Sequence, residues 1–308
     1  MATIISVASG KGGVGKSVVV ANLGLLLSRE GLRVVLADMD VGGANIHILF
    51  GEFNPTTTIT DFIYRRVESL EEVVHPLVFP GLSIIPGTGD TLATANMPFA
   101  RKKRLINHLK KIDADVIIID VGAGTGFHAL DFFLMADRHL TVATPDPTSV
   151  LDLYRFVKLA AIRRVLSIFL SRGNVADTLA HQDFSSVEEV LTAVGKTDEK
   201  NRATAEGALE AFTPSLILNR VAPKGKVNTL QLKMTLKKYV GCDITTLGEI
   251  PDDEAVLRSV RAFLPVVDFA PESPAAKGFA QVAAALIDTL EEESAPPTPE
   301  EEAGKLPE

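Results

Sequence analysis

A glycine-rich segment near the N-terminus carries the residues best suited to chemistry. Residues 9–17 read Ser-Gly-Lys-Gly-Gly-Val-Gly-Lys-Ser and contain the pattern G-x-x-x-x-G-K-[ST], between a β-branched run and a helical apolar pattern. Unpaired backbone N–H groups and the start of a helix attract anions, and glycine lets phosphate approach closely. The pattern predicts a site for ATP or ADP in which Lys16 contacts the β- and γ-phosphates and Ser17 binds Mg²⁺. The residues assigned to the nucleotide here are Gly10, Lys11, Gly12, Gly13, Val14, Gly15, Lys16, Ser17 and Val18.

Three aspartates at the ends of predicted strands complete the expected site. Asp38 and Asp40 end the run Arg-Val-Val-Leu-Ala-Asp-Met-Asp, and Asp120 ends the run Val-Ile-Ile-Ile-Asp. A carboxyl at the end of a buried strand is unfavourable unless it faces a metal, water or hydrogen-bond donors. Phosphoryl transfer depends mainly on positioning and charge neutralisation, so these carboxylates are placed to organise Mg²⁺ and an attacking water. Solvated aspartates at a strand end, and a purely structural Asp120, are the alternatives.

The elements that must position these residues alternate along the chain. Short β-branched runs predict strands near residues 3–8, 33–38, 82–86, 115–120, 139–143, 215–219 and 244–248. Helical patterns cover residues 15–29, 98–111, 148–164, 227–240 and 275–290. This alternation predicts an α/β fold in three layers, with a mostly parallel, doubly wound sheet flanked by helices. Ligand is expected at the carboxyl ends of the strands.

One ATPase domain is expected over residues 1–290. Two segments of the chain do not fit a simple alternation of strands and helices. Residues 165–213 are too long for a return loop and contain a helix start at Ser185-Ser186-Val187-Glu188-Glu189, which predicts a small helical insertion. The insertion is either a structural lid or a partner-binding element. Residues 291–308 are rich in Glu and Pro without an apolar face, so a disordered acidic tail is expected there. The apolar stripe of 275–290 carries few basic residues, so we expect it to pack on the sheet rather than on lipid.

Composition and charge limit the class of protein. The chain has 308 residues, and the net charge of −8 falls largely on residues 291–308, whose seven Glu and one Lys give −6. The single cysteine, Cys242, provides neither a disulfide framework nor a cysteine metal cluster within one chain. There is no secretion signal and no apolar stretch of membrane-spanning length. A cytoplasmic location is predicted, with a peripheral position at the inner face of the membrane as the second option.

The run Lys11-Gly12-Gly13-Val14-Gly15-Lys16-Ser17 resembles the deviant Walker A motif of the MinD/ParA family of P-loop ATPases. The segments 38–51 and 144–149 are similar to the FlhG/MinD-like branch of that family. The resemblance implies a homodimer on ATP binding, in which Lys11 reaches the phosphates of the partner subunit. It also implies that Asp40 positions the hydrolytic water and that Ser17, Asp38 and Asp120 hold Mg²⁺. The catalytic residues implied are Lys11, Lys16 and Asp40.

Two further segments are assigned to the base of the nucleotide by the same resemblance. Asn219 and Arg220 follow one predicted strand, and Pro251 and Asp252 follow the last. In the family the corresponding Asn bonds the adenine edge and the proline segment lines the base pocket. An amide can donate to and accept from adenine at once, which gives the assignment a chemical reason. A turn asparagine at a strand end is the alternative.

The leading interpretation is an Mg²⁺-dependent ATPase that acts as an ATP-gated dimerisation switch and positions or regulates a partner complex. An unidentified protein activator or cargo is expected; a membrane contact would lack a basic C-terminal anchor. One alternative is a DNA-binding segregation ATPase of ParA type, in which a basic region would contact phosphates. A solvated helix face also explains that region, which comprises Lys224, Lys226, Lys233, Lys237, Lys238, Arg258 and Arg261. A nucleotide-gated scaffold with negligible turnover is the other alternative.

Overall fold

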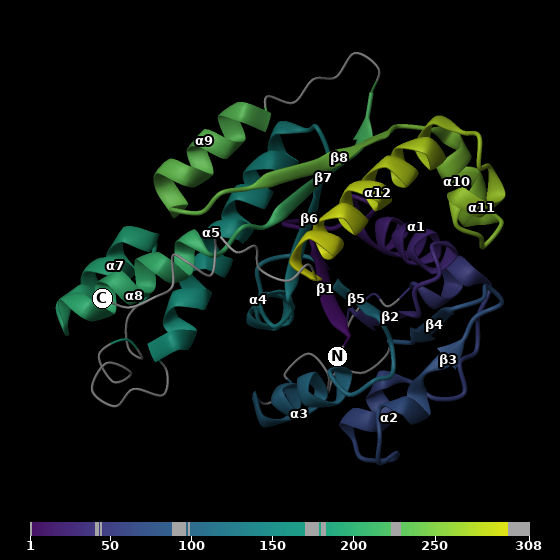
Figure 1. Cartoon of the computed structure of the whole chain (residues 1–308), viewed down its shortest axis with the longest axis horizontal. Coiled ribbons are helices and arrows are strands. Elements are labelled where there is room, and N and C mark those ends of the chain that lie inside the picture. The colour runs from purple at the N-terminus through teal and green to yellow at the C-terminus, as the bar shows by residue number, and fades with distance from the viewer. Residues whose placement is uncertain are drawn as a thin grey trace.

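A single eight-stranded sheet forms the centre of the molecule (Figure 1). The computed structural model describes residues 2–40, 43, 45–87, 97, 99–169, 179, 183–222 and 229–294. Along the sheet the strand order is β3-β4-β2-β5-β1-β6-β7-β8. The strands are β1 (Thr3–Ala8), β2 (Val34–Met39), β3 (His75–Pro76), β4 (Leu82–Ile85), β5 (Val116–Val121), β6 (Arg138–Ala143), β7 (Ser215–Val221) and β8 (Thr245–Pro251). Neighbouring strands are parallel except for β3 and β4, so the predicted mostly parallel, doubly wound sheet is confirmed.

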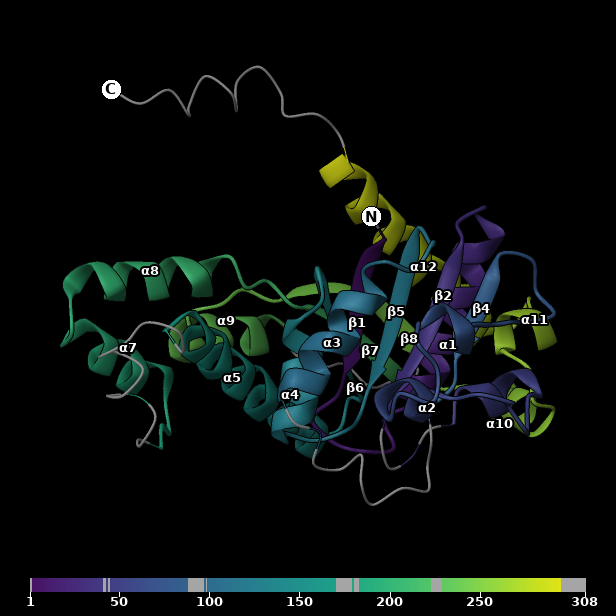
Figure 2. The same ribbon diagram turned by 90° about the horizontal axis from the view of Figure 1, so that it is seen from below.

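Helices cover both faces of this sheet and make three layers (Figure 2). Strand β5 is apolar throughout because its alternate side chains enter two different cores: Ile117 and Ile119 join one, and Val116 and Ile118 the other. One core is closed mainly by α3 (Phe99–Leu109), α4 (Phe127–Leu134), α5 (Pro147–Phe169) and α9 (Thr229–Val240). The other is closed by α1 (Lys16–Arg29), α10 (Glu254–Arg261), α11 (Val266–Phe269) and α12 (Pro274–Ser294). Three short elements follow β2 along the chain and precede β4: η1 (His47–Phe50), α2 (Ile59–Ile63) and η2 (Glu71–Val73).

Helix α12 packs on the sheet as its apolar stripe predicts. Phe279, Val282 and Leu286 are almost completely buried in the core that α1 and β8 also line. The helix ends at Ser294 instead of residue 290, so the first residues assigned to the acidic tail belong to it. The rest of that tail lies outside the described residues. None of the helices in the described parts of the chain is long and apolar enough to span a bilayer.

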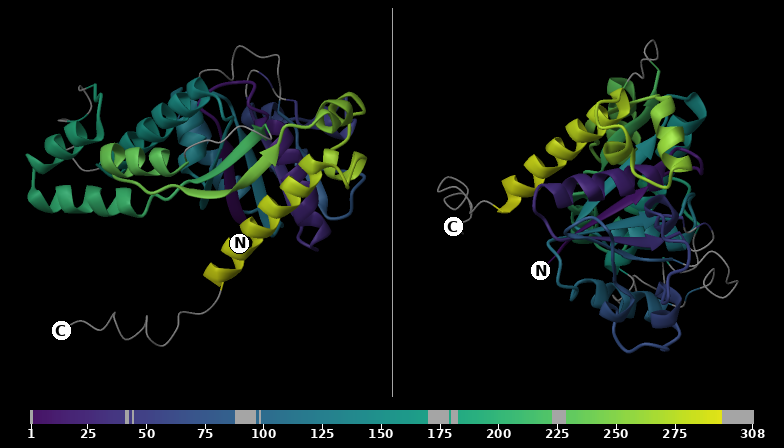
Figure 3. Two further views of the ribbon diagram at one scale, coloured as in Figure 1. Left: turned by 90° about the horizontal axis from the view of Figure 1, so that it is seen from above. Right: turned by 90° about the vertical axis from the view of Figure 1, so that its right-hand side faces the viewer.

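The described part of residues 165–213 contains helices, and the helix before it ends later than predicted. Helix α5 continues without a break to Phe169 instead of ending at residue 164. Helices α7 (Val187–Gly195) and α8 (Glu199–Glu210) follow and lie beside α5, far from α10 and α11 (Figure 3). The predicted helix start is confirmed: the Ser186 side chain accepts a hydrogen bond from Glu189 N, and the Glu189 carboxylate accepts one from Ser185 N.

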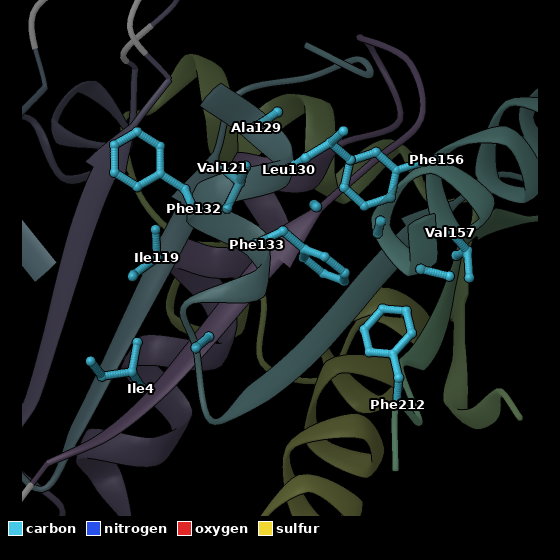
Figure 4. Packing of buried hydrophobic residues seen from close by; sticks show 14 of the residues in the cluster. Ile4, Ile119, Val121, Ala129, Leu130, Phe132, Phe133, Phe156, Val157 and Phe212 are labelled. Carbon is cyan, nitrogen blue, oxygen red and sulfur yellow. The ribbon is translucent and has the colours of Figure 1, made fainter. Parts of the chain in front are cut away.

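An aromatic cluster fills the core where β6 meets α4 and α5 (Figure 4). The Phe133 ring lies edge-on to Phe156 and to His139, with ring centroids 5.0 and 5.1 Å apart. Phe212 packs against both His139, at 5.3 Å, and Phe133, at 6.3 Å. Burial in this apolar setting lowers the pKa of His139 from 6.5 to about 4. The histidine is therefore neutral in the folded protein at neutral pH.

This histidine makes folding stability dependent on pH. Between pH 6.5 and 4 the unfolded chain takes up a proton at residue 139 that the folded chain does not, so the contribution is complete above pH 6.5 and is lost as pH falls. Unfolding by urea, measured at several pH values, should show that the parent loses about 3 kcal/mol more than His139→Leu across this interval. If the free energy of unfolding falls by the same amount with pH in both proteins, the histidine is not held neutral in the fold.

Candidate functional site

The glycine-rich segment forms the turn from β1 into α1, where the backbone itself requires glycine. Gly15 precedes α1 with a φ of 87°, and a Cβ there would lie 2.4 Å from Asn219 Nδ2. A Cβ on Gly10 would lie 2.2 Å from the carbonyl oxygen of Asp152. No side chain caps the first turn of α1, so its N–H groups remain available to an anion. The geometry matches that expected of a phosphate-binding loop.

The predicted carboxylates meet the end of this loop. Strands β2 and β5 are neighbours, and their register places Asp38 opposite Asp120. The ammonium of Lys16 forms an ion pair with Asp120 and lies 3.9 Å from Asp40 Oδ2. Lys16 is 6% exposed and Asp120 is completely buried. The fold thus gathers residues from three separate segments of the sequence at the carboxyl ends of two central strands. They are Lys16, Ser17, Asp38, Asp40 and Asp120.

This cluster holds more negative charge than its lysine neutralises. Burial, and then the charge of Asp120, raise the pKa of Asp38 to about 7. Burial also raises the pKa of Asp120, against the opposing effects of Lys16 and of a hydrogen bond from Ser17. Among the described residues, Asp120 Oδ2 is buried without a hydrogen-bond partner. A second cation beside these oxygens would stabilise both charged carboxylates.

The donor set fits Mg²⁺ bound together with phosphate. The hydroxyl of Ser17 and the oxygens of Asp38 and Asp120 are hard ligands of the kind that Mg²⁺ prefers. In the parts of the chain that the structure describes, no group of three or more His, Cys, Asp or Glu side chains could hold a metal alone. That suits an ion held by few side chains, because Mg²⁺ keeps several waters and uses substrate phosphates as ligands.

Lys11 does not join the carboxylate cluster. Its ammonium donates a hydrogen bond to Thr148 Oγ1, 3.0 Å away, near the start of α5. It forms no ion pair within the described part of the chain. The loop therefore carries two lysines with different surroundings: Lys16 is buried against carboxylates, whereas Lys11 is partly exposed.

A cavity of about 440 Å³ adjoins the loop at Gly15 and Val18. The four residues assigned to the base line it from the ends of β7 and β8: Asn219, Arg220, Pro251 and Asp252. Asn219 Nδ2 donates to the Val14 carbonyl, 2.8 Å away, and so ties β7 to the loop. Arg220 has a φ of 59°, uncommon without glycine, and its Nε lies 3.4 Å from Asp252 Oδ1.

Helix α10 supplies the remaining wall of this cavity and was not predicted. It contributes Val256, Leu257 and Val260, and the carboxylate of Asp253 caps it by accepting from Ala255 N. A signal for it was present in the sequence, since a capping acid precedes apolar residues at helical spacing. These apolar side chains give the cavity the mixed character typical of a small-molecule site.

The basic residues considered for DNA do not form one surface. Lys233, Lys237 and Lys238 lie on α9, and Lys237 is paired with Asp243 at 2.8 Å. Arg258 and Arg261 lie on α10 at the opposite end of the molecule (Figure 1), so the expectation that they add to the same region is wrong. Lys224 and Lys226 lie outside the described residues.

Two known bacterial proteins are similar in sequence to about half of this chain. The antiactivator FleN of Pseudomonas aeruginosa is 35% identical over 176 residues, covering 56% of this chain and 61% of FleN. The flagellum site-determining protein YlxH of Helicobacter pylori is 33% identical over 164 residues, covering 50% of this chain and 52% of YlxH. The chain thus spans between half and two thirds of the length of these relatives.

Solved structures show the same fold over nearly the whole chain. The septum site-determining protein MinD of Pyrococcus horikoshii, complexed with Mg-ADP, superposes with a TM-score of 0.66 at 23% identity and covers 96% of this chain and 99% of its own. The family model described as the CobQ/CobB/MinD/ParA nucleotide binding domain matches residues 5–266. The chain therefore belongs to the MinD/ParA family of nucleotide-binding proteins, whose members are generally ATP hydrolases, and is related to FleN, YlxH and MinD.

Proposed function

We propose that this protein is an Mg²⁺-dependent ATPase that acts as an ATP-gated dimerisation switch and regulates a partner complex. The observation that carries the proposal is the continuity of the site. Gly15 belongs both to the phosphate loop and to the wall of the cavity beside it, and Lys16 begins the carboxylate cluster. A nucleotide with its base in the cavity would place its phosphates along the loop toward Lys16.

The residues of the chain divide the work of hydrolysis among them. The loop amides and Lys16 bind and orient the phosphates, while Ser17, Asp38 and Asp120 would hold Mg²⁺, which would neutralise the charge that develops in phosphoryl transfer. Asp40 is the carboxylate nearest to Lys16 that stays partly exposed, with 28% of its side chain accessible. We assign it the positioning of the attacking water, since it is reachable from solvent and close to the phosphate site.

Dimerisation and a partner are supported by Lys11 and by the relatives. The Lys11 ammonium is on the loop yet outside its own carboxylate cluster, and it would exchange its hydrogen bond to Thr148 Oγ1 for a phosphate of a second subunit. One superposable structure is the MinC:MinD cell division protein complex of Aquifex aeolicus, with a TM-score of 0.64 at 19% identity. The name of YlxH refers to determination of the flagellum site, and that of FleN to an antiactivator. A protein partner that recognises the ATP-bound dimer is the function that we propose.

The switch is tested by removing the lysine that would serve the second subunit. Lys11→Ala should bind ATP with an affinity within about threefold of the parent, since its side chain makes no contact with the carboxylate cluster, yet it should stay monomeric with Mg²⁺ and ATP. Light scattering after gel filtration, with and without ATP, gives the mass. Lys110→Ala removes an exposed lysine beyond α3 and should dimerise normally. An ATP-dependent dimer of Lys11→Ala would exclude the role across the interface.

A further inference from the structure

A second group of charged residues lies between α2 and α3, outside the nucleotide site. Four arginines, Arg65, Arg66, Arg101 and Arg104, gather there around two aromatic rings. The guanidinium carbons of Arg66 and Arg101 lie 5.9 and 5.4 Å from the centre of the Tyr64 ring, and that of Arg104 lies 4.2 Å from the centre of the Phe62 ring. A cavity of about 230 Å³, the α2–α3 pocket, is lined by Ile63, Tyr64, Arg65, Arg101 and Arg104.

Positive charge in this pocket exceeds the negative charge that faces it. Asp61 pairs with Arg66 at 3.0 Å, and Arg66 does not line the pocket. Within the described part of the chain, Arg65 and Arg101 form no ion pair, and Arg104 donates only to the backbone carbonyls of residues 62 and 68. Three guanidinium groups of like charge therefore share one small space. An anion between them would remove their mutual repulsion.

Arg65 occupies a backbone position where glycine is preferred. Residues 65 and 66 end α2 in a helix-terminating turn, with Arg66 N donating to the Asp61 carbonyl at 2.8 Å and Arg65 N to the Phe62 carbonyl at 3.1 Å. The φ of Arg65 is 59°, a left-handed conformation that glycine adopts more easily than any other residue. The chain thus has arginine at a site where local stability favours glycine, which is understandable if the side chain has a use.

We propose that the α2–α3 pocket binds a phosphate group, provided by an anionic phospholipid or by a soluble phosphate ester. Guanidinium groups match the geometry of phosphate oxygens, and their flat faces stack on aromatic rings as they do here. Lys103, Lys110 and Lys111 are exposed on and just beyond the same helix, and they add positive charge on this side of the molecule.

The test compares the parent with a variant that lacks two of the arginines. Arg65→Gly with Arg101→Gln should bind vesicles containing phosphatidylglycerol about 25-fold more weakly than the parent in a sedimentation assay, since each basic residue near an anionic surface is worth about fivefold. Lys196→Gln with Lys200→Gln removes the same charge from exposed positions in the insertion and is the matched control. A second arm follows the rise in melting temperature with inorganic phosphate. Phosphate binding at the phosphate loop raises the melting temperature equally in the parent and the double arginine variant. The difference between their melting-temperature shifts therefore measures binding in the α2–α3 pocket.

Stability separates a binding role from a structural one. Arg65→Gly alone should melt at the same temperature as the parent or higher, because glycine suits its φ. It should nevertheless bind the phosphate group several-fold more weakly. Loss in the vesicle arm identifies a lipid headgroup, and loss only in the phosphate arm identifies a soluble ester. Equal binding by the parent and the double variant in both arms would overturn the proposal.

Discussion

Lys16→Ala is expected to abolish ATP binding, with an affinity at least about 100-fold below that of the parent and no measurable turnover. The ammonium of Lys16 is the only cation in contact with the buried carboxylate cluster in the described chain, and it lies where the loop delivers the phosphates. Without it, the phosphates would face Asp38, Asp40 and Asp120 with no side-chain cation between them. Titration calorimetry with Mg²⁺ and ATP measures the affinity.

A loss of folding must be distinguished from a loss of binding, because Lys16→Ala also leaves Asp120 buried without its partner. Lys102 provides a matched control: it is equally buried, and its ammonium pairs with Asp131 at 2.6 Å away from the loop. Lys16→Ala should destabilise the fold by about 3 kcal/mol, because Asp120 stays buried without an ion-pair partner, and Lys102→Ala should destabilise it less, because Asp131 keeps its pair with Arg163 at 3.0 Å. Lys102→Ala should still bind ATP. If Lys16→Ala binds ATP as tightly as the parent, the phosphate site has been assigned wrongly.

The parts of the fold that the sequence predicts well are those with strong local patterns. Seven of the eight strands begin within one residue of the predicted position, because most of them are apolar runs buried in the sheet; β8 is largely exposed and is marked by its β-branched residues alone. Strand β3 has two residues, one of them Pro76, and so carries no pattern. Helix α8 was missed because only Ala205 and Leu209 are buried along it. Elements with little apolar periodicity become visible only through their tertiary contacts.

The site shows the same division between local and long-range information. The phosphate loop is a contiguous motif, and its strand and helix lie where the motif requires them. The pairing of Lys16 with Asp120 joins residues 104 positions apart and depends on β1 and β2 lying on either side of β5. The contribution of α10 to the cavity depends likewise on its packing near β8. The α2–α3 pocket has no sequence motif, since its arginines come from two separate helix ends.

Asp40→Ala is expected to bind ATP normally and to slow hydrolysis by about 10²- to 10⁴-fold. The backbone N–H of Asp40 donates to Asp38 Oδ1 at 3.1 Å, so the Asp38 carboxylate holds the backbone of Asp40 in place beside Lys16. A Cβ on Gly122 would lie 3.3 Å from Asp40 Oδ1, which shows how closely the segment after β5 approaches this carboxylate. The side chain is thus fixed at the phosphate end of the site but is not required to hold the nucleotide.

The stalled protein should accumulate as an ATP-bound dimer, because hydrolysis is the step that releases the subunits in the proposed switch. Single-turnover hydrolysis and light scattering, measured on the same sample, should show slow cleavage together with a persistent dimer. Asp268→Ala is the matched control, since Asp268 has a similar exposure, 34% against 28%, and pairs with Arg29 on α1 outside the cluster. Asp40→Asn should behave like Asp40→Ala if the charge of the carboxylate is needed to orient water. Turnover within about threefold of the parent in both Asp40 variants would mean that another group positions the water, and a stalled protein that remains monomeric would separate hydrolysis from dimerisation.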